Sequence, residues 1–250
     1  MPTRWFVPIP GLDPTRVRLE HVHAAISGWF DRTLAEHRCN DKPYAVSPPT
    51  RDTRGIAGVE VVTLTDQAAE RLATATRRTA DGALPQIRLG NQWRPLGTPC
   101  PLHTAAWHTL AAPTDGTEWR LELATPTTFR SGNRSSPLPT VEGLLRSARA
   151  AWTQWSDTPM PEGDGRSLWV SDLDLRSELL PVTIRGADGD PRDLHVSGIT
   201  GTIVVRHDPA DRAAAALVRT TAYTGIGAMT LKGLGVTRVT ALRSRRADAG

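Results

Sequence analysis

The order of predicted strands and helices repeats once along this chain of 250 residues, and this repeat is the strongest constraint on its fold. Alternating apolar residues indicate strands, and apolar residues at three- and four-residue spacing indicate amphipathic helices. In the first half these patterns predict a strand over 5–9, a helix over 17–34, strands over 44–48 and 58–64, a helix over 66–77, and a sheet edge at 86–89 with the segment around Trp93. The order is β-α-β-β-α-β.

The second half gives the same order with little identity in sequence. It is predicted to hold a strand over 119–124, a helix over 141–155, a hairpin of 179–184 and 194–206, a helix over 208–221 and a last strand over 236–240. Two copies of β-α-β-β-α-β predict an α+β chain of two tandem ferredoxin-like domains. The small, turn-forming residues 111–116 mark the boundary, so the domains are expected over 1–113 and 117–250.

Composition excludes several classes of protein. The chain is 39% hydrophobic, has no apolar run long enough to span a bilayer, and begins without the apolar region of a signal peptide. Its two cysteines, Cys39 and Cys100, provide neither a disulfide framework nor a paired zinc motif. We therefore expect a cytoplasmic protein with no membrane association, cofactor or metal. A net charge of +4 is too mild to require a polyanionic partner.

A glycine-rich loop near the end of the chain combines Gly225, Gly227, Lys232, Gly233 and Gly235. Glycine permits positive φ and a close backbone approach, and successive exposed amides in such a loop favour anions. A dinucleotide motif would need a long βαβ unit after it, and a phosphate-binding Walker loop would need its lysine after the last glycine. The loop is predicted to bind phosphates of a ligand other than a nucleotide cofactor. The alternative is a glycine-rich turn before an edge strand.

Two histidines and a lysine are candidates for catalysis. His23 lies in the first predicted helix, His37 in the predicted turn after it, and Lys42 five residues further on. Two histidines can divide the general-base and general-acid roles, and a lysine can stabilise charge on a phosphoryl oxygen. His21 stands about 200° from His23 around a helix, so both cannot face one pocket, and we prefer His23. The sequence shows no spacing of residues that is typical of metal ligands. The three residues therefore suit a reaction in which the 2′-hydroxyl of the RNA attacks the neighbouring phosphate.

Four segments occur in the order typical of a known family: 21–26 with the pattern HVHAAI, 37–48 with a histidine followed by KPYAVSP, 125–130 with TPTTFR, and the glycine-rich loop. In these segments the chain resembles the CRISPR-associated endoribonucleases that process repeat RNA, the sixth Cas family of the RAMP superfamily. The two glycine pairs with their lysine are the most specific match. The first segment is the least specific, because the active-site residue on the first helix varies among members of the family.

This resemblance implies a metal-independent endoribonuclease that cuts CRISPR repeat RNA, leaving 2′,3′-cyclic phosphate and 5′-hydroxyl ends. It implies catalytic roles for His37 and Lys42, with His23 as the helix partner. The implied partners are the precursor and the mature crRNA, and other Cas proteins of an interference complex are further candidates. The sequence leaves the oligomeric state open, with a homodimer as one candidate. Two alternatives remain at this stage: a non-catalytic RNA-binding subunit of the same superfamily, and a ferredoxin-like module for a small ligand.

Arginines are expected to contact the RNA backbone. The candidates are Arg130 and Arg134, which flank a Ser-Gly-Asn turn, and Arg185 and Arg192, on the second-domain hairpin. Such contacts give affinity without reading sequence. Aromatic residues make up only 5% of the chain, and none are paired like the stacking aromatics of an RNA-recognition sheet. For each arginine taken singly, the alternative is a solvated loop.

Overall fold

The computed structural model describes residues 1–39, 41–132, 134–185 and 191–242, which form two compact units. The first unit consists of Met1–Ala106 with Thr230–Gly233, and the second consists of Trp107–Met229 with the chain from Leu234 onward. The division falls before the segment 111–116, where the domain boundary was predicted. Arg219, a residue of the second unit, donates to the carbonyl of Ala112 at 2.6 Å and so ties this segment to that unit.

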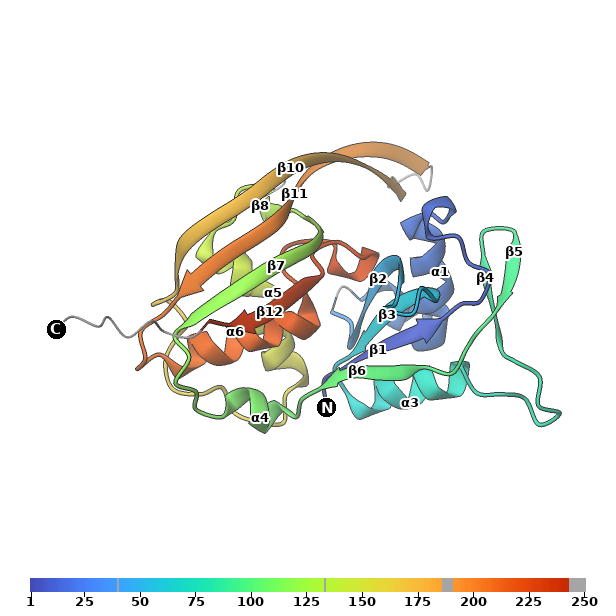
Figure 1. Ribbon diagram of the computed structural model, residues 1–250, viewed down its shortest axis with the longest axis horizontal. Helices are drawn as coiled ribbons and strands as arrows, with labels where there is room; N and C mark the ends of the chain where they lie inside the picture. Colours follow the sequence, from blue (N-terminus) through green and yellow to red (C-terminus); the bar gives the residue numbers. More distant parts are fainter. Residues whose placement is uncertain (40, 133, 186–190, 243–250) are drawn as a thin grey trace. The chain divides into compact units, whose positions relative to one another are not determined.

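The first unit contains the predicted ferredoxin-like order of elements (Figure 1). They are β1 (Thr3–Pro8), the 3-10 helix η1 (Pro14–Arg16), α1 (Leu19–Phe30), α2 (Leu34–Arg38), β2 (Tyr44–Arg51), β3 (Ala57–Thr63), α3 (Asp66–Ala75), β4 (Gln86–Leu89), β5 (Gln92–Pro95) and β6 (Cys100–Thr104). The antiparallel sheet has the order β2-β3-β1-β6. Val22, Ile26 and Phe30 lie at four-residue spacing on α1 and are buried in one core with Val59 and Val61 of β3.

Two predicted elements of this unit are corrected by the structure. The fourth strand of the sheet is β6, which pairs with β1 from Thr3 opposite Thr104, whereas β4 and β5 form a separate hairpin. The helix predicted over 17–34 ends at Phe30, because Asp31 has an extended backbone and Thr33 begins a new helix. His37, predicted in a turn, therefore lies in a helix.

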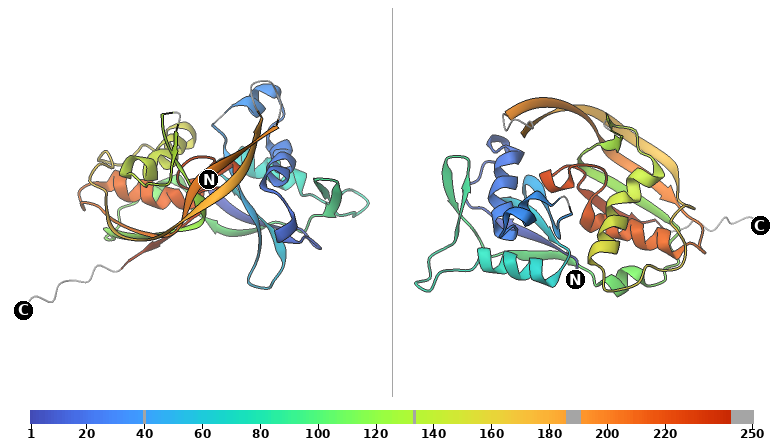
Figure 2. Two further views of the ribbon diagram at one scale, coloured as in Figure 1. Left: turned by 90° about the horizontal axis from the view of Figure 1, so that it is seen from above. Right: turned by 180° about the vertical axis from the view of Figure 1, so that it is seen from behind.

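The second unit repeats the architecture. Its elements are α4 (Trp107–Ala111), β7 (Glu118–Thr127), β8 (Phe129–Ser131), β9 (Arg134–Ser136), α5 (Val141–Trp155), β10 (Trp169–Arg185), β11 (Pro191–Arg206), α6 (Arg212–Thr224) and β12 (Thr237–Ala241). The sheet order is β10-β11-β7-β12, and β8 pairs with β9 alone. Figure 2 (right) shows α5 and α6 across one face of the sheet, where Leu145 and Leu217 are buried with Leu121 and Ile203. The predicted pair of ferredoxin-like domains is confirmed.

Local capping explains why the helices of this unit begin where they do. The hydroxyl of Thr140 accepts a hydrogen bond from the amide of Gly143 at 3.0 Å, and α5 has the bounds predicted from its periodicity. Asp211 caps α6 in the same way through the amide of Ala214 at 3.0 Å, so this helix begins after the predicted start at 208. In the described ranges, no helix is long and apolar enough to cross a membrane.

Candidate active site

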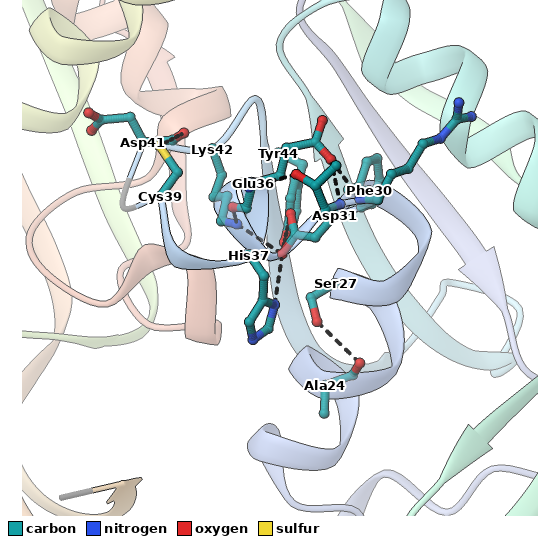
Figure 3. Close-up of polar contacts among 12 residues, drawn as sticks. Ala24, Ser27, Phe30, Asp31, Glu36, His37, Cys39, Asp41, Lys42 and Tyr44 are labelled. Atoms are coloured by element: carbon teal, nitrogen blue, oxygen red, sulfur yellow. Dashed lines mark hydrogen bonds and ion pairs between the residues drawn. The ribbon is translucent and has the colours of Figure 1, made fainter. Parts of the chain in front are cut away.

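A buried carboxylate joins two of the predicted catalytic residues in the first unit (Figure 3). Oδ2 of Asp31 lies 2.9 Å from Nζ of Lys42 and 3.2 Å from Nδ1 of His37. The side chain of Asp31 is 5% exposed and that of Lys42 is 6% exposed, whereas that of His37 is 58% exposed. A buried charge needs a counter-charge and hydrogen bonds. The cluster supplies both, and it holds one ring nitrogen of an otherwise accessible imidazole.

Tyr44, the first residue of β2, completes the environment of this carboxylate. Its hydroxyl donates toward both oxygens of Asp31 at 3.3 Å, and its ring stacks on Phe30 with the ring centroids 4.2 Å apart. Burial and the neighbouring Asp31 raise the pKa of the Tyr44 hydroxyl, which therefore stays protonated and acts as a donor.

The short helix α2 is shaped by a capping box. The hydroxyl of Thr33 accepts from the amide of Glu36, and a carboxylate oxygen of Glu36 accepts from the amide of Thr33, each at 3.1 Å. The other oxygen of Glu36 pairs with Arg71 of α3 at 2.9 Å, and this hydrogen bond is the main cause of the lowered pKa of Glu36. Arg71 also donates to the carbonyl of Phe30. One guanidinium thus fixes the end of α1 relative to the start of α2, and with it Asp31 relative to His37.

Lys42 differs from its predicted role in one respect. Its ammonium group is buried and contacts Asp31 and the backbone carbonyl of Glu36, instead of lying open to a ligand. In the described structure it neutralises the carboxylate and ties the segment before β2 to α2. Its effect on a phosphoryl group stays a prediction.

His23 is half-buried on α1 and lies in the electric field of the same cluster. Burial lowers its pKa, the positive charge of Lys232 lowers it further, and Asp31 acts in the opposite direction. Lys232 ends the 3-10 helix η2 (Thr230–Lys232), which packs with α1 and β2 of the first unit. His21 is on the same helix, but its ring points away from this cluster and packs beside Gly90, between β4 and β5. These positions agree with the choice of His23 over His21.

The glycine-rich loop takes the backbone conformation expected of it. The φ angles are +68° at Gly225, +84° at Gly227, +85° at Gly233 and +70° at Gly235. The amides of Gly225, Gly233 and Gly235, however, donate to backbone carbonyls of the protein at 2.9, 3.2 and 3.0 Å. These three amides are therefore already used and are not free to hold phosphate, which argues against the predicted anion cradle as the reason for these three glycines.

Close packing gives a sufficient reason for two of the glycines. A Cβ atom on Gly227 would lie 2.4 Å from the carbonyl oxygen of Thr128, and one on Gly235 would lie 1.9 Å from that of Ile226. Such distances cannot be accommodated without moving the backbone. Contacts inside the second unit therefore explain why these two positions are glycine. Phosphate contact by the loop stays a prediction, and it rests mainly on Lys232.

The predicted RNA-binding arginines fall into two groups. Arg130 of β8 and Arg134 of β9 are both exposed on one short hairpin. Their exposure fits both phosphate contact and a solvated loop, so RNA binding by these arginines stays a prediction. The backbone of Arg185 ends β10 and that of Arg192 lies near the start of β11, but both side chains lie outside the described part of the structure.

Sequence reasoning missed Asp31, which the site is built around. The signal for it is modest: an acidic residue directly follows the apolar stripe of α1, at the end of a helix where a negative charge is unfavourable. The capping box Thr33-Leu34-Ala35-Glu36 was a stronger signal, since the pattern predicts a helix start three residues after Phe30. Together they indicate that the chain turns at Asp31.

Comparison with known proteins adds an independent observation. Residues 121–237, from within β7 to the first residue of β12, match the family model of the CRISPR-associated endoribonuclease Cas6. The predicted family resemblance is confirmed. A comparison with curated protein sequences finds no match.

Solved structures of Cas6 proteins share the fold. A Cas6 product complex superimposes with a TM-score of 0.73 at 20% identity, over 96% of this chain and 100% of that chain. Thermus thermophilus Cas6 gives 0.67 at 19% identity, over 96% and 98%. The product of a Cas6-related gene from Pyrococcus furiosus gives 0.51 at 10% identity, over 96% and 99%. At these identities the likeness establishes the tandem ferredoxin-like fold.

Proposed function

We propose that this protein is a metal-independent endoribonuclease that cleaves CRISPR repeat RNA in a precursor transcript and so releases guide crRNAs. The observation that carries the proposal is the match of residues 121–237 to the Cas6 family model. It is supported by the site of the first unit, where an exposed His37 is held by the buried carboxylate of Asp31. The Cas6 proteins of similar fold include one that was solved both with a product and with a substrate mimic.

The proposed reaction uses the RNA's own 2′-hydroxyl as nucleophile. Because burial and Lys232 lower the pKa of His23, this imidazole is neutral at neutral pH and suited to accept the 2′-hydroxyl proton. The 2′-oxygen forms a bond to phosphorus as the bond to the 5′-oxygen breaks, and His37 gives a proton from Nε2 to that leaving oxygen. The products are a 2′,3′-cyclic phosphate and a 5′-hydroxyl, and proton exchange with water restores both histidines.

A repeat RNA with a single 2′-deoxy nucleotide just upstream of the cut tests this proposal. The deoxy RNA should bind with unchanged affinity and remain uncut, while the all-ribose RNA is cut equally well with and without EDTA. Single-turnover cleavage with gel analysis measures both. Cleavage of the deoxy RNA, or loss of cleavage in chelator, would instead point to a metal-activated water.

A second candidate function is a non-catalytic RNA-binding subunit of the same superfamily. The burial of Lys42 favours it, because that ammonium is engaged inside the protein. Wild-type protein that binds repeat RNA tightly but leaves it intact over hours would select this candidate.

A further inference from the structure

We infer that Asp31 is a positioning residue, which fixes the tautomer of His37 so that Nε2 is the nitrogen that exchanges a proton with RNA. The use of that proton in cleavage rests on the proposed function. The tautomer itself is a property of the protein without RNA, and it can be measured independently of any cleavage.

Asp31 contacts a cation and a hydroxyl donor. Its Oδ2 lies 2.9 Å from the buried ammonium of Lys42, and the Tyr44 hydroxyl donates toward both oxygens. These partners favour the ionised carboxylate, which accepts hydrogen bonds and cannot donate them. A hydrogen bond to Nδ1 of His37, 3.2 Å away, therefore requires the proton to be on Nδ1.

The chemistry of imidazole then decides the state of the other nitrogen. A neutral imidazole carries one N–H, so a proton on Nδ1 leaves the lone pair on Nε2. The charged form carries a second proton on Nε2, and that proton is the one that leaves, because the carboxylate keeps the first. The same carboxylate–imidazole pairing sets tautomer and orientation in hydrolytic triads and in metal-binding histidines.

The position of Asp31 is itself fixed by the fold. Its amide donates to the carbonyl of Ser27 at 2.8 Å and so closes the last turn of α1. Phe30 beside it is stacked on Tyr44, and Lys42 lies against the same Oδ2 that faces His37 (Figure 3). The carboxylate therefore meets the imidazole without having to move.

A purely structural role for Asp31 gives a different expectation. If Asp31 served only to neutralise Lys42, its replacement would reduce stability and leave the protonation pattern of His37 unchanged. The two roles are separated by nitrogen-15 NMR of histidine-labelled full-length protein, because the two ring nitrogens report directly which of them carries the proton.

The test compares wild-type protein with Asp31→Asn above the titration range of the histidines. We expect Nδ1 of His37 to be protonated in the wild type, and the Nε2–H form to gain at least several-fold in population in the variant. The control is Asp52→Asn, which removes another partly buried carboxylate, paired with Arg54 at 3.0 Å, and should leave His37 unchanged. A wild type dominated by the Nε2–H form, or an unchanged tautomer in Asp31→Asn, would overturn the inference.

Asp31→Asn leaves the Lys42 ammonium buried without its counter-charge, so the single variant can fail to fold. The double variant Asp31→Asn/Lys42→Met removes both charges and should fold. We expect the Nε2–H form to increase there as well. A wild-type tautomer in the folded double variant would show that Asp31 does not set the protonation of His37.

The consequence for catalysis is tested last. In a folded variant without the Asp31 carboxylate, single-turnover cleavage of repeat RNA should fall by at least about tenfold with little change in RNA affinity, because proton transfer and not binding is impaired. If the wild type does not cut repeat RNA, the proposed function fails while the tautomer result stands. If the tautomer shifts and the variant cuts at the wild-type rate, the positioning role is overturned.

Discussion

At the scale of single residues, the charge of Asp31 is held where a helix would disfavour it. Asp31 follows the last residue of α1, and the C-terminal end of a helix carries partial negative charge. Burial adds a further cost for an ionised carboxylate. The ammonium of Lys42 and the hydroxyl of Tyr44 offset both effects. We therefore expect the effects of Asp31 and Lys42 on the free energy of unfolding to be strongly coupled.

Removing Lys42 alone should reveal this coupling. Lys42→Met leaves Asp31 as a buried charge without a partner, and the free energy of unfolding should fall by about 3–5 kcal/mol at pH 7. Urea denaturation of both single variants and of Asp31→Asn/Lys42→Met measures the effect. Strictly additive losses in the double variant would contradict the coupling.

His23 of α1 should titrate at lower pH than an ordinary histidine. Burial and the charge of Lys232 both lower the pKa of His23 from 6.5. Since the folded pKa lies below the unfolded one, the contribution of His23 to stability is complete above pH 6.5 and is lost as pH falls through the folded value. Lys232→Ala should raise the pKa of His23 and leave His21 unaffected, which a proton NMR titration can follow. An unchanged His23 would show that Lys232 does not act on it.

At the scale of elements, α2 owes its position to its cap. Thr33→Ala removes one half of the capping box and should cost about 1 kcal/mol, largely as fraying of α2 around His37. Thr65→Ala is a matched control, because Thr65 caps α3 through the amide of Ala68 at 3.2 Å. Similar losses of thermal stability are expected for both variants, with slower cleavage and faster amide exchange of α2 for Thr33→Ala alone. Equal cleavage rates in the two variants would mean that order in α2 does not limit the reaction.

The glycine-rich loop offers a similar comparison within the second unit. Gly235 and Gly132 both have positive φ, +70° and +61°, so replacement by alanine strains the backbone at either site. Only at Gly235 would the new Cβ meet a carbonyl oxygen, at 1.9 Å, whereas nothing lies within 4 Å at Gly132. Gly235→Ala should therefore lower the melting temperature clearly more than Gly132→Ala, as calorimetry would show. Equal melting temperatures would remove close packing as the reason for this glycine.

The elements also show what the sequence alone could establish. The periodicity of α5 predicted its two ends, and the glycine spacing predicted positive φ, because both depend on neighbouring residues. The end of α1 depends on Arg71, which contacts the carbonyl of Phe30 from a distant helix. The amide of Gly235 donates to the carbonyl of Pro126, a residue far away in the sequence. Pattern reasoning contains neither of these long-range partners.

At the scale of the whole molecule, one short segment belongs to a different compact unit from its neighbours in the sequence. Met229 and Leu234 belong to the second unit, whereas the four residues between them pack with the first. Lys232 is thereby placed in the field of His23, although the two lie far apart in the sequence. The sequence predicted both ferredoxin-like units, and it singled out His23, His37 and Lys42 as candidates for catalysis. It could not predict that the lysine of the glycine-rich loop would act on His23.

The salt dependence of RNA binding tests the predicted phosphate contacts of the whole protein. Each phosphate contact with a single strand changes the slope of log affinity against log salt by about 0.7. Lys232→Ala should therefore reduce the slope by about one contact, and Arg130→Ala with Arg134→Ala by about two. Arg54→Ala is the control, because Arg54 is paired with Asp52. Binding of repeat RNA, measured by fluorescence anisotropy from low to moderate salt, gives the slopes. A slope in the arginine double variant equal to that of the control would show that the β8–β9 hairpin is a solvated loop and that the RNA backbone is held elsewhere.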